Sequence, residues 1–121
     1  MCPEIQYPVS MMAMFASEPT SHHCKMLKRI LQYLKLHKEM GLVFDSSPKK
    51  GLSMEMRGFV DASYADNYGT PKDNRRSTTG FVFMLGGAAI SWSSKRQAVV
   101  ACSTTGSEYI AAYTATRGAI C

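Results

Sequence analysis

Apolar residues in the first third of the chain recur at steps of three and four, which is the spacing of one helix face. This spacing predicts a short helix over about 7–16, which ends before Pro19 because a proline restricts the backbone of its predecessor. It also predicts a longer helix that Thr20 or Ser21 caps and that Gly41 ends. The apolar stripe of this second helix consists of four residues: Leu27, Ile30, Leu31 and Leu34.

Further along the chain the pattern changes to short runs of β-branched and aromatic residues, which favour strands. The pair Gly86-Gly87 separates two of these runs. Because glycine readily adopts the positive φ angles of a tight hairpin, the pair predicts a turn between two antiparallel strands. Four strands are expected, over 42–44, 58–66, 80–85 and 89–94.

An alanine-rich run near the C-terminus predicts a helix over about 106–118. Thr105 and Glu108 match the spacing of a capping box at its start. The elements together predict a mixed α/β (α+β) fold, in which N-terminal helices precede a three-stranded antiparallel meander and one more helix. Three alanines would let that last helix pack closely against the sheet: Ala111, Ala112 and Ala115.

A polar loop over 45–53 divides the chain into a helical segment, residues 1–53, and a second domain, residues 54–121. The whole chain has 121 residues, which is enough for one modest core, and a net charge of +5. The positive charge is compatible with a polyanionic partner such as nucleic acid.

The cysteine pattern and the hydropathy indicate an intracellular protein. The four cysteines include no C-x-x-C pair, so neither a structural zinc site nor a disulfide framework is expected. No apolar run approaches the length of a membrane span, and the N-terminus has no signal-peptide pattern. We therefore expect a cytoplasmic or nuclear protein that is not secreted and has no membrane partner.

Two acidic residues stand out as candidates for chemistry. Asp61 follows two apolar residues in an expected strand, where alternation places it on one face with Phe59 and Ser63. It is either a strand-end residue that faces water or a metal ligand on a rigid element. Glu108 lies in the expected first turn of the last helix, where it either completes the capping box or supplies a second ligand.

Carboxylate oxygens suit Mg²⁺ or Mn²⁺, and two such ions can assist phosphodiester cleavage. Such a site needs several acids that converge from rigid elements. Asp66 is a weaker third candidate, because an extended strand would direct it to the face opposite Asp61. From spacing alone, a metal site and a purely structural role for these acids both stay open.

Five short motifs occur along the second domain in an order and spacing that are together highly specific. They are Asp61-Ala62-Ser63-Tyr64-Ala65-Asp66, Arg75-Arg76-Ser77-Thr78-Thr79-Gly80-Phe81-Val82-Phe83, Leu85-Gly86-Gly87, Ile90-Ser91-Trp92-Ser93-Ser94-Lys95, and Ser103-Thr104 followed by Glu108-Tyr109. With them the chain resembles the ribonuclease H region of copia-type retrotransposon Pol polyproteins. Its N-terminal part, including Lys28-Arg29-Ile30-Leu31, resembles the segment that links reverse transcriptase to ribonuclease H in those polyproteins.

The resemblance implies a partial ribonuclease H-like fold and cleavage of the RNA strand of an RNA–DNA hybrid with two divalent ions, Mg²⁺ or Mn²⁺. By motif, Asp61 and Glu108 match the first two catalytic, metal-binding acids. The implied partners are an RNA–DNA hybrid or other nucleic acid and the remainder of the Pol polyprotein, with its reverse transcriptase. Four basic residues are candidate contacts to the hybrid backbone on electrostatic grounds: Arg75, Arg76, Lys95 and Arg96.

The chain departs from the family pattern at its C-terminal end. The family's third metal-binding Asp lies in a strand after the last helix, but this chain ends earlier and has no acid after Glu108. We therefore expect a C-terminally truncated fragment that is weakly active or inactive alone. The alternatives are a non-catalytic relic that binds nucleic acid or protein, a nuclease completed by another chain, and an ordinary basic α/β domain.

Overall fold

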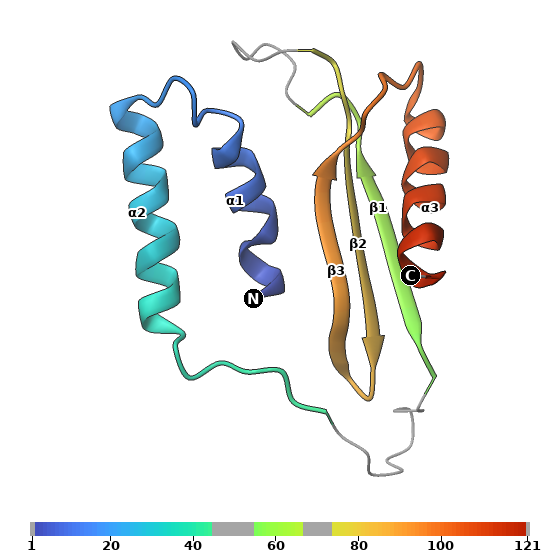
Figure 1. The fold of residues 1–121 in the computed structure, drawn as a ribbon, viewed down its shortest axis with the longest axis horizontal. Coiled ribbons are helices and arrows are strands. Elements are labelled where there is room, and N and C mark those ends of the chain that lie inside the picture. Colours follow the sequence, from blue (N-terminus) through green and yellow to red (C-terminus); the bar gives the residue numbers. More distant parts are fainter. Residues whose placement is uncertain (1, 45–54, 67–73, 121) are drawn as a thin grey trace. The chain divides into compact units, whose positions relative to one another are not determined.

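The computed structural model describes residues 2–44, 55–66 and 74–120, which fall into two compact units, Met1–Gly41 and Leu42–Cys121 (Figure 1). The predicted domain boundary between residues 53 and 54 lies outside the described residues. The mixed α/β fold is confirmed. The first unit contains η1 (Pro3–Ile5), α1 (Gln6–Ala13) and α2 (Ser21–Leu36), and the second contains β1 (Arg57–Ser63), β2 (Thr78–Leu85), β3 (Ala88–Arg96) and α3 (Thr104–Ile120).

In the first unit, α2 begins where its sequence predicts a cap. The Thr20 hydroxyl accepts a hydrogen bond from the His23 N–H, and the His23 ring accepts one from the Thr20 N–H, so the two residues form a capping box. The His23 ring also stacks on Phe15, with ring centroids 4.2 Å apart. Both helices are shorter than predicted, because α1 ends at Ala13 and His37 leaves helical geometry after α2.

The second unit is built on an antiparallel sheet in the order β1-β2-β3. Gly86 and Gly87 form the β2–β3 turn with φ angles of 57° and 82°, as their sequence predicts. The register shifts between Phe83, which pairs with Ser91, and Met84, which pairs with Ala89. Ile90 is therefore the extra residue of a β-bulge in β3.

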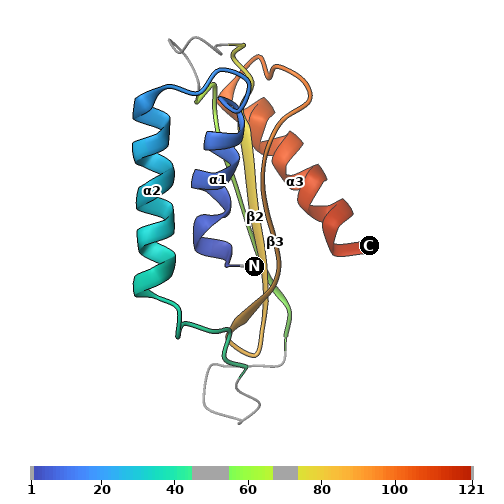
Figure 2. The ribbon, with the colours of Figure 1, turned by 60° about the vertical axis from the view of Figure 1, so that its left-hand side comes forward.

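Helix α3 forms a layer of its own beside the sheet (Figure 2). Its small residues allow a close approach: Ala111 and Ala115 are buried, and a Cβ atom on Gly118 would come within 2.9 Å of the Phe81 ring. The predicted packing role of Ala112 is wrong, because this residue is exposed. It follows Ala111 by one residue and so lies about 100° further around the helix.

Two of the predicted strands differ from the structure. Residues 42–44 form no strand. β1 ends at Ser63, not at Asp66, because Ala65 has a positive φ of 46° and its N–H donates to the Ser77 hydroxyl. That left-handed residue turns the backbone out of the extended conformation.

The predicted capping box at Thr105 and Glu108 is also wrong. Helix α3 begins at Thr104, and the Ser103 hydroxyl accepts a hydrogen bond of 3.0 Å from the Gly106 N–H. Ser103 is thus the residue that caps the helix, and Thr105 lies inside it. Glu108 consequently falls in the second turn of α3, since the first turn contains no acidic residue.

Candidate functional site

One end of the sheet collects most of the residues that the sequence singles out. Ser63, at the end of β1, pairs with Thr78, at the start of β2, and Thr78 pairs with Arg96, at the end of β3. Helix α3 starts at this same end (Figure 1). We call this end, defined by the row Ser63, Thr78 and Arg96, the Ser63 end of the sheet.

Gln97 joins the first part of α3 to the Ser63 end. Its buried side-chain amide donates to the Thr79 hydroxyl, at 3.0 Å, and to the Ser107 carbonyl, at 2.9 Å. Its backbone N–H donates to the carbonyl of the buried Ser77 at 2.8 Å. Because Ser107 precedes Glu108, these bonds hold the helix turn that carries Glu108 against the sheet.

Asp61 lies on the sheet face that α3 does not cover. Phe81 faces α3, since its ring lies next to Gly118, and alternate residues of a strand face opposite sides. Asp61 pairs with Gly80, the neighbour of Phe81, so the two acids come from different sides of the sheet. Asp61 shares its face with Phe59 and Ser63, as alternation predicts, and it is exposed.

Glu108 projects from the exposed surface of α3. It lines an open hollow of about 580 Å³ together with other residues of the same helix. That hollow is lined by Thr104, Thr105, Glu108, Tyr109 and Ala112.

Asp66 differs from both other acids, because part of its side chain is enclosed. Its Oδ2 atom is buried and has no hydrogen-bond partner among the described residues. The reason for treating Asp66 as the weaker candidate does not hold, since that reason assumed a strand, and residues 64–66 form a turn.

The described residues do not form a complete metal site. In the described ranges, no group of three or more His, Cys, Asp or Glu side chains lies close enough to hold a metal ion. Asp61 and Glu108 offer the hard oxygen ligands that Mg²⁺ or Mn²⁺ prefers, but two exposed carboxylates from different sides of the sheet are insufficient. The roles predicted for them stay predictions.

The four predicted phosphate-binding cations surround the Ser63 end. Arg75 and Arg76 are exposed and directly precede the buried Ser77 and β2. In β3, Lys95 pairs with Thr79 on the side of α3, and the half-buried Arg96 lies on the side of Asp61. The cations therefore reach both faces of this end of the sheet.

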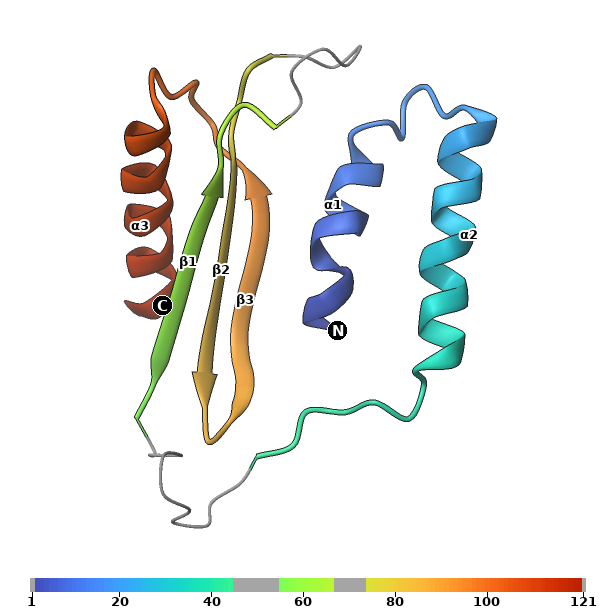
Figure 3. The ribbon, with the colours of Figure 1, turned by 180° about the vertical axis from the view of Figure 1, so that it is seen from behind.

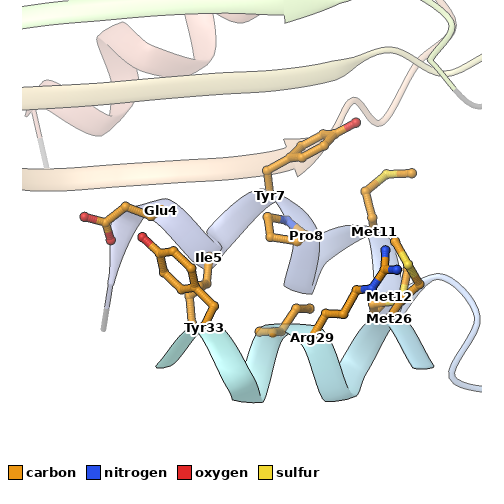
Figure 4. A pocket seen from close by; sticks show the side chains of 10 residues that line it. Glu4, Ile5, Tyr7, Pro8, Met11, Met12, Met26, Arg29 and Tyr33 are labelled. Carbon is orange, nitrogen blue, oxygen red and sulfur yellow. The ribbon is translucent and has the colours of Figure 1, made fainter. Parts of the chain in front are cut away.

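The first unit contains a cavity that the sequence does not predict (Figure 4). It has a volume of about 550 Å³ and lies between α1 and α2. Three methionines line it, and their flexible, polarizable side chains can adapt to an irregular apolar space. Its lining is mostly apolar and consists of Glu4, Ile5, Tyr7, Pro8, Met11, Met12, Met26, Arg29, Ile30 and Tyr33.

Among the described helices, none combines the length and the apolar character that crossing a membrane requires.

The chain is similar to proteins of retrotransposon origin and to one effector protein. It is 36% identical over 118 residues to the secreted RxLR effector protein 161 of Plasmopara viticola, covering 98% of this chain and 78% of that protein. It is 39% identical over 110 residues to the retrovirus-related Pol polyprotein from transposon TNT 1-94 of Nicotiana tabacum, and 36% identical over 111 residues to a putative transposon Ty5-1 protein of Saccharomyces cerevisiae.

The chain spans only part of these transposon relatives. Each of the two alignments covers 91% of this chain, but 8% of the tobacco polyprotein and 33% of the yeast protein. No family model and no solved structure matches the chain.

Proposed function

We propose that this chain is the nucleic-acid-binding part of a ribonuclease H-like domain. The premise is that it belongs to the family of the secreted RxLR effector protein 161 of Plasmopara viticola and is similar to retrotransposon Pol polyproteins. The substrate class is an RNA–DNA hybrid. The order of elements supports this proposal: an acid in the first strand of an antiparallel meander precedes an acid in the following helix. The motifs of the ribonuclease H region lie on these same elements.

The observation that carries the proposal is the gathering of four cations around the Ser63 end. Lys and Arg side chains supply most of the affinity of proteins for nucleic acid, because they neutralise backbone phosphates. Phosphate contacts of this kind position the nucleic acid without reading its sequence. The Ser63 end would thus bind the hybrid backbone beside Asp61 and Glu108.

The proposal does not extend to cleavage of the hybrid by this chain alone. Asp61 and Glu108 are two acids, and the described residues contain no group of three that could hold a metal ion. We therefore propose that this chain binds a hybrid without cutting it, and that hydrolysis requires an acid from additional polypeptide. The rest of a Pol polyprotein is the natural source of that polypeptide.

Binding is tested by the fluorescence anisotropy of a labelled RNA–DNA hybrid titrated with the 121-residue chain over a range of salt concentrations. We expect Arg75→Ser/Arg76→Ser to weaken binding and to lower the slope of log K against log salt by roughly 1 for each phosphate that the variant no longer neutralises. The matched control is Lys25→Ser/Lys28→Ser, which removes the same charge from exposed positions of α2.

The two variants separate binding at the Ser63 end from general attraction to a basic protein. An equal loss of affinity in both would contradict the proposal, as would an unchanged slope in the arginine variant. Asp61→Asn/Glu108→Gln should retain binding, since these acids contact no phosphate directly in the absence of metal.

A further inference from the structure

The connection between α1 and α2, residues 14–20, meets the start of α2 at the ring of His23 (Figure 3). The Nδ1 atom of this ring lies 3.1 Å from the backbone nitrogen of Thr20 and 3.1 Å from its hydroxyl oxygen. The same ring stacks on Phe15, with 22° between the two ring planes. His23 therefore contacts the connection twice, near its first residue and at its last.

The bond from the Thr20 N–H defines the protonation state of the His23 ring. Nδ1 accepts this bond only while it carries no proton, so the ring is a neutral imidazole with its proton on Nε2. A proton on Nδ1 would place two donors, Nδ1–H and the Thr20 N–H, opposite each other. The Thr20 hydroxyl oxygen can accept from a protonated ring, but the Thr20 N–H then loses its acceptor.

The surroundings of the His23 ring also favour its neutral form. The first turn of a helix is the positive end of the helix dipole, and α2 has no acidic residue there. The ring borders an apolar hollow of about 300 Å³ between α1 and α2, whose lining includes Met12, Phe15 and Leu27. A cation beside this surface would lose part of its hydration. The face of Phe15 attracts a cation weakly, but it does not replace the acceptor that Thr20 loses.

Few charged groups near His23 could offset a positive charge on its ring. α1 contains no charged residue, and its one titratable side chain is Tyr7. The connection contains one acid, Glu18, which is exposed and already takes part in an interaction of its own. The titratable neighbours of His23 within α2 are His22, Cys24 and Lys25. None of these three carries a negative charge at neutral pH that would compensate a protonated imidazole.

We propose that His23 is a pH-sensitive latch, which holds the start of α2 at neutral pH and releases it in mild acid. An imidazole takes up its second proton between about pH 8 and about pH 5. Because the neutral ring makes the hydrogen bond, its contribution is fully present at the upper end of this range and is lost as the pH falls. Release loosens the first turn of α2 and, through Phe15, the connection to α1. This proposal goes beyond hybrid binding and does not depend on it.

Amide hydrogen exchange tests the latch, measured by NMR on the 121-residue chain at about pH 7.5 and about pH 5.5, without metal or nucleic acid. Two amides report on the first turn of α2: His23 N–H donates to the Thr20 hydroxyl, and Cys24 N–H donates to the Thr20 carbonyl. Each rate is compared with the intrinsic rate at the same pH, which gives a protection factor. We expect both protection factors to fall at least about threefold at the lower pH, as for the loss of a capping interaction.

His23→Gln separates the hydrogen bond from the titration. Glutamine is a usual residue at this position of a capping box, and its amide oxygen accepts from the Thr20 N–H without taking up a proton. This variant should keep its protection at both pH values. His22→Gln is the matched control, since it removes the neighbouring imidazole and should leave the fall in protection unchanged. Glu18→Gln should leave the fall in place as well, because the carboxylate is not the group that titrates.

The ring nitrogens of His23 give a second measurement that requires no variant. ¹⁵N chemical shifts distinguish a protonated from an unprotonated ring nitrogen. We expect the proton on Nε2 at the higher pH, and we expect Nδ1 to take up a proton over the same pH range in which the protection of α2 falls. A ring that carries its proton on Nδ1 at the higher pH would contradict the proposal, since this nitrogen could not accept from Thr20.

Three further results would overturn the proposal: protection that does not change with pH, a fall that persists in His23→Gln, or a fall that His22→Gln or Glu18→Gln abolishes. The amides of α3 are the internal reference. An equal fall in their protection would also contradict the latch, because it would report unfolding of the whole chain. Since exchange is measured without a hybrid, failure here is distinguishable from failure of hybrid binding.

Discussion

Helix α2 carries the clearest apolar stripe of the chain, whereas α3 is rich in alanine, threonine and glycine, yet α3 is the helix that buries side chains. No residue of α2 is buried, and Leu31, in the middle of the stripe, is 58% exposed. α3 buries Ser107, Ala111 and Ala115 against the sheet. Amphipathic periodicity thus identifies a helix, but burial depends on how large a surface its partner offers.

The same contrast holds for the two units as wholes. Every buried residue of the described chain lies in the second unit, where strands and helix cover one another. In the first unit α2 contacts α1, which has only eight residues. Two helices of this size leave apolar surface exposed on both.

The largest effect that this comparison predicts is a difference in stability between two substitutions by alanine, one in each unit. Phe83→Ala removes a buried ring from the sheet and should lower the free energy of unfolding by about 3–5 kcal/mol. Leu31→Ala removes an exposed side chain from α2 and should cost no more than about 1 kcal/mol. Urea denaturation followed by circular dichroism measures both, and equal losses of stability would mean that α2 is covered in solution.

A smaller effect is expected at Gln97, which bonds the sheet to α3. Gln97→Ala leaves the Ser107 carbonyl and the Thr79 hydroxyl without this donor and should cost about 1–3 kcal/mol. Gln32→Ala, at an exposed position of α2, is the control and should stay within about 0.5 kcal/mol of the original stability. If the two variants unfolded at the same urea concentration, Gln97 would not hold the helix against the sheet.

The smallest expected change in stability concerns the N-cap of α3, and it distinguishes the observed capping residue from the predicted one. Ser103→Ala removes the acceptor for the Gly106 N–H and should cost about 1 kcal/mol. Thr105→Ala changes an exposed residue inside the helix and should be nearly neutral. A larger destabilisation at Thr105 than at Ser103 would restore the predicted capping box.

Local chemistry explains which parts of the fold the sequence predicts. Gly86-Gly87 requires only its own backbone preferences to form a hairpin turn, and Thr20 caps α2 through a residue three positions away. Strand alternation likewise predicts the face of Asp61 without knowledge of any partner. These features depend on neighbours in sequence, which the chain displays directly.

The remaining features depend on contacts between distant residues. The end of β1 follows from the bond between Ala65 and Ser77, and α3 is fixed by Gln97, which bonds to Thr79 and Ser107. Nothing in the local pattern distinguishes Ser103 from Thr105 as the cap, since both are good capping residues. The gathering of the four cations around the Ser63 end likewise depends on the pairing of distant strands, so it could not be predicted from spacing.

The central proposal is that this chain binds an RNA–DNA hybrid at the Ser63 end, where the described residues form no complete metal site. The direct measurement is cleavage of a labelled hybrid by the folded 121-residue chain with Mg²⁺ and with Mn²⁺, beside an Asp61→Asn variant. We predict binding by both proteins and no cleavage by either. Cleavage that Asp61→Asn abolishes would contradict the claim, because it would mean that the chain assembles a working site by itself.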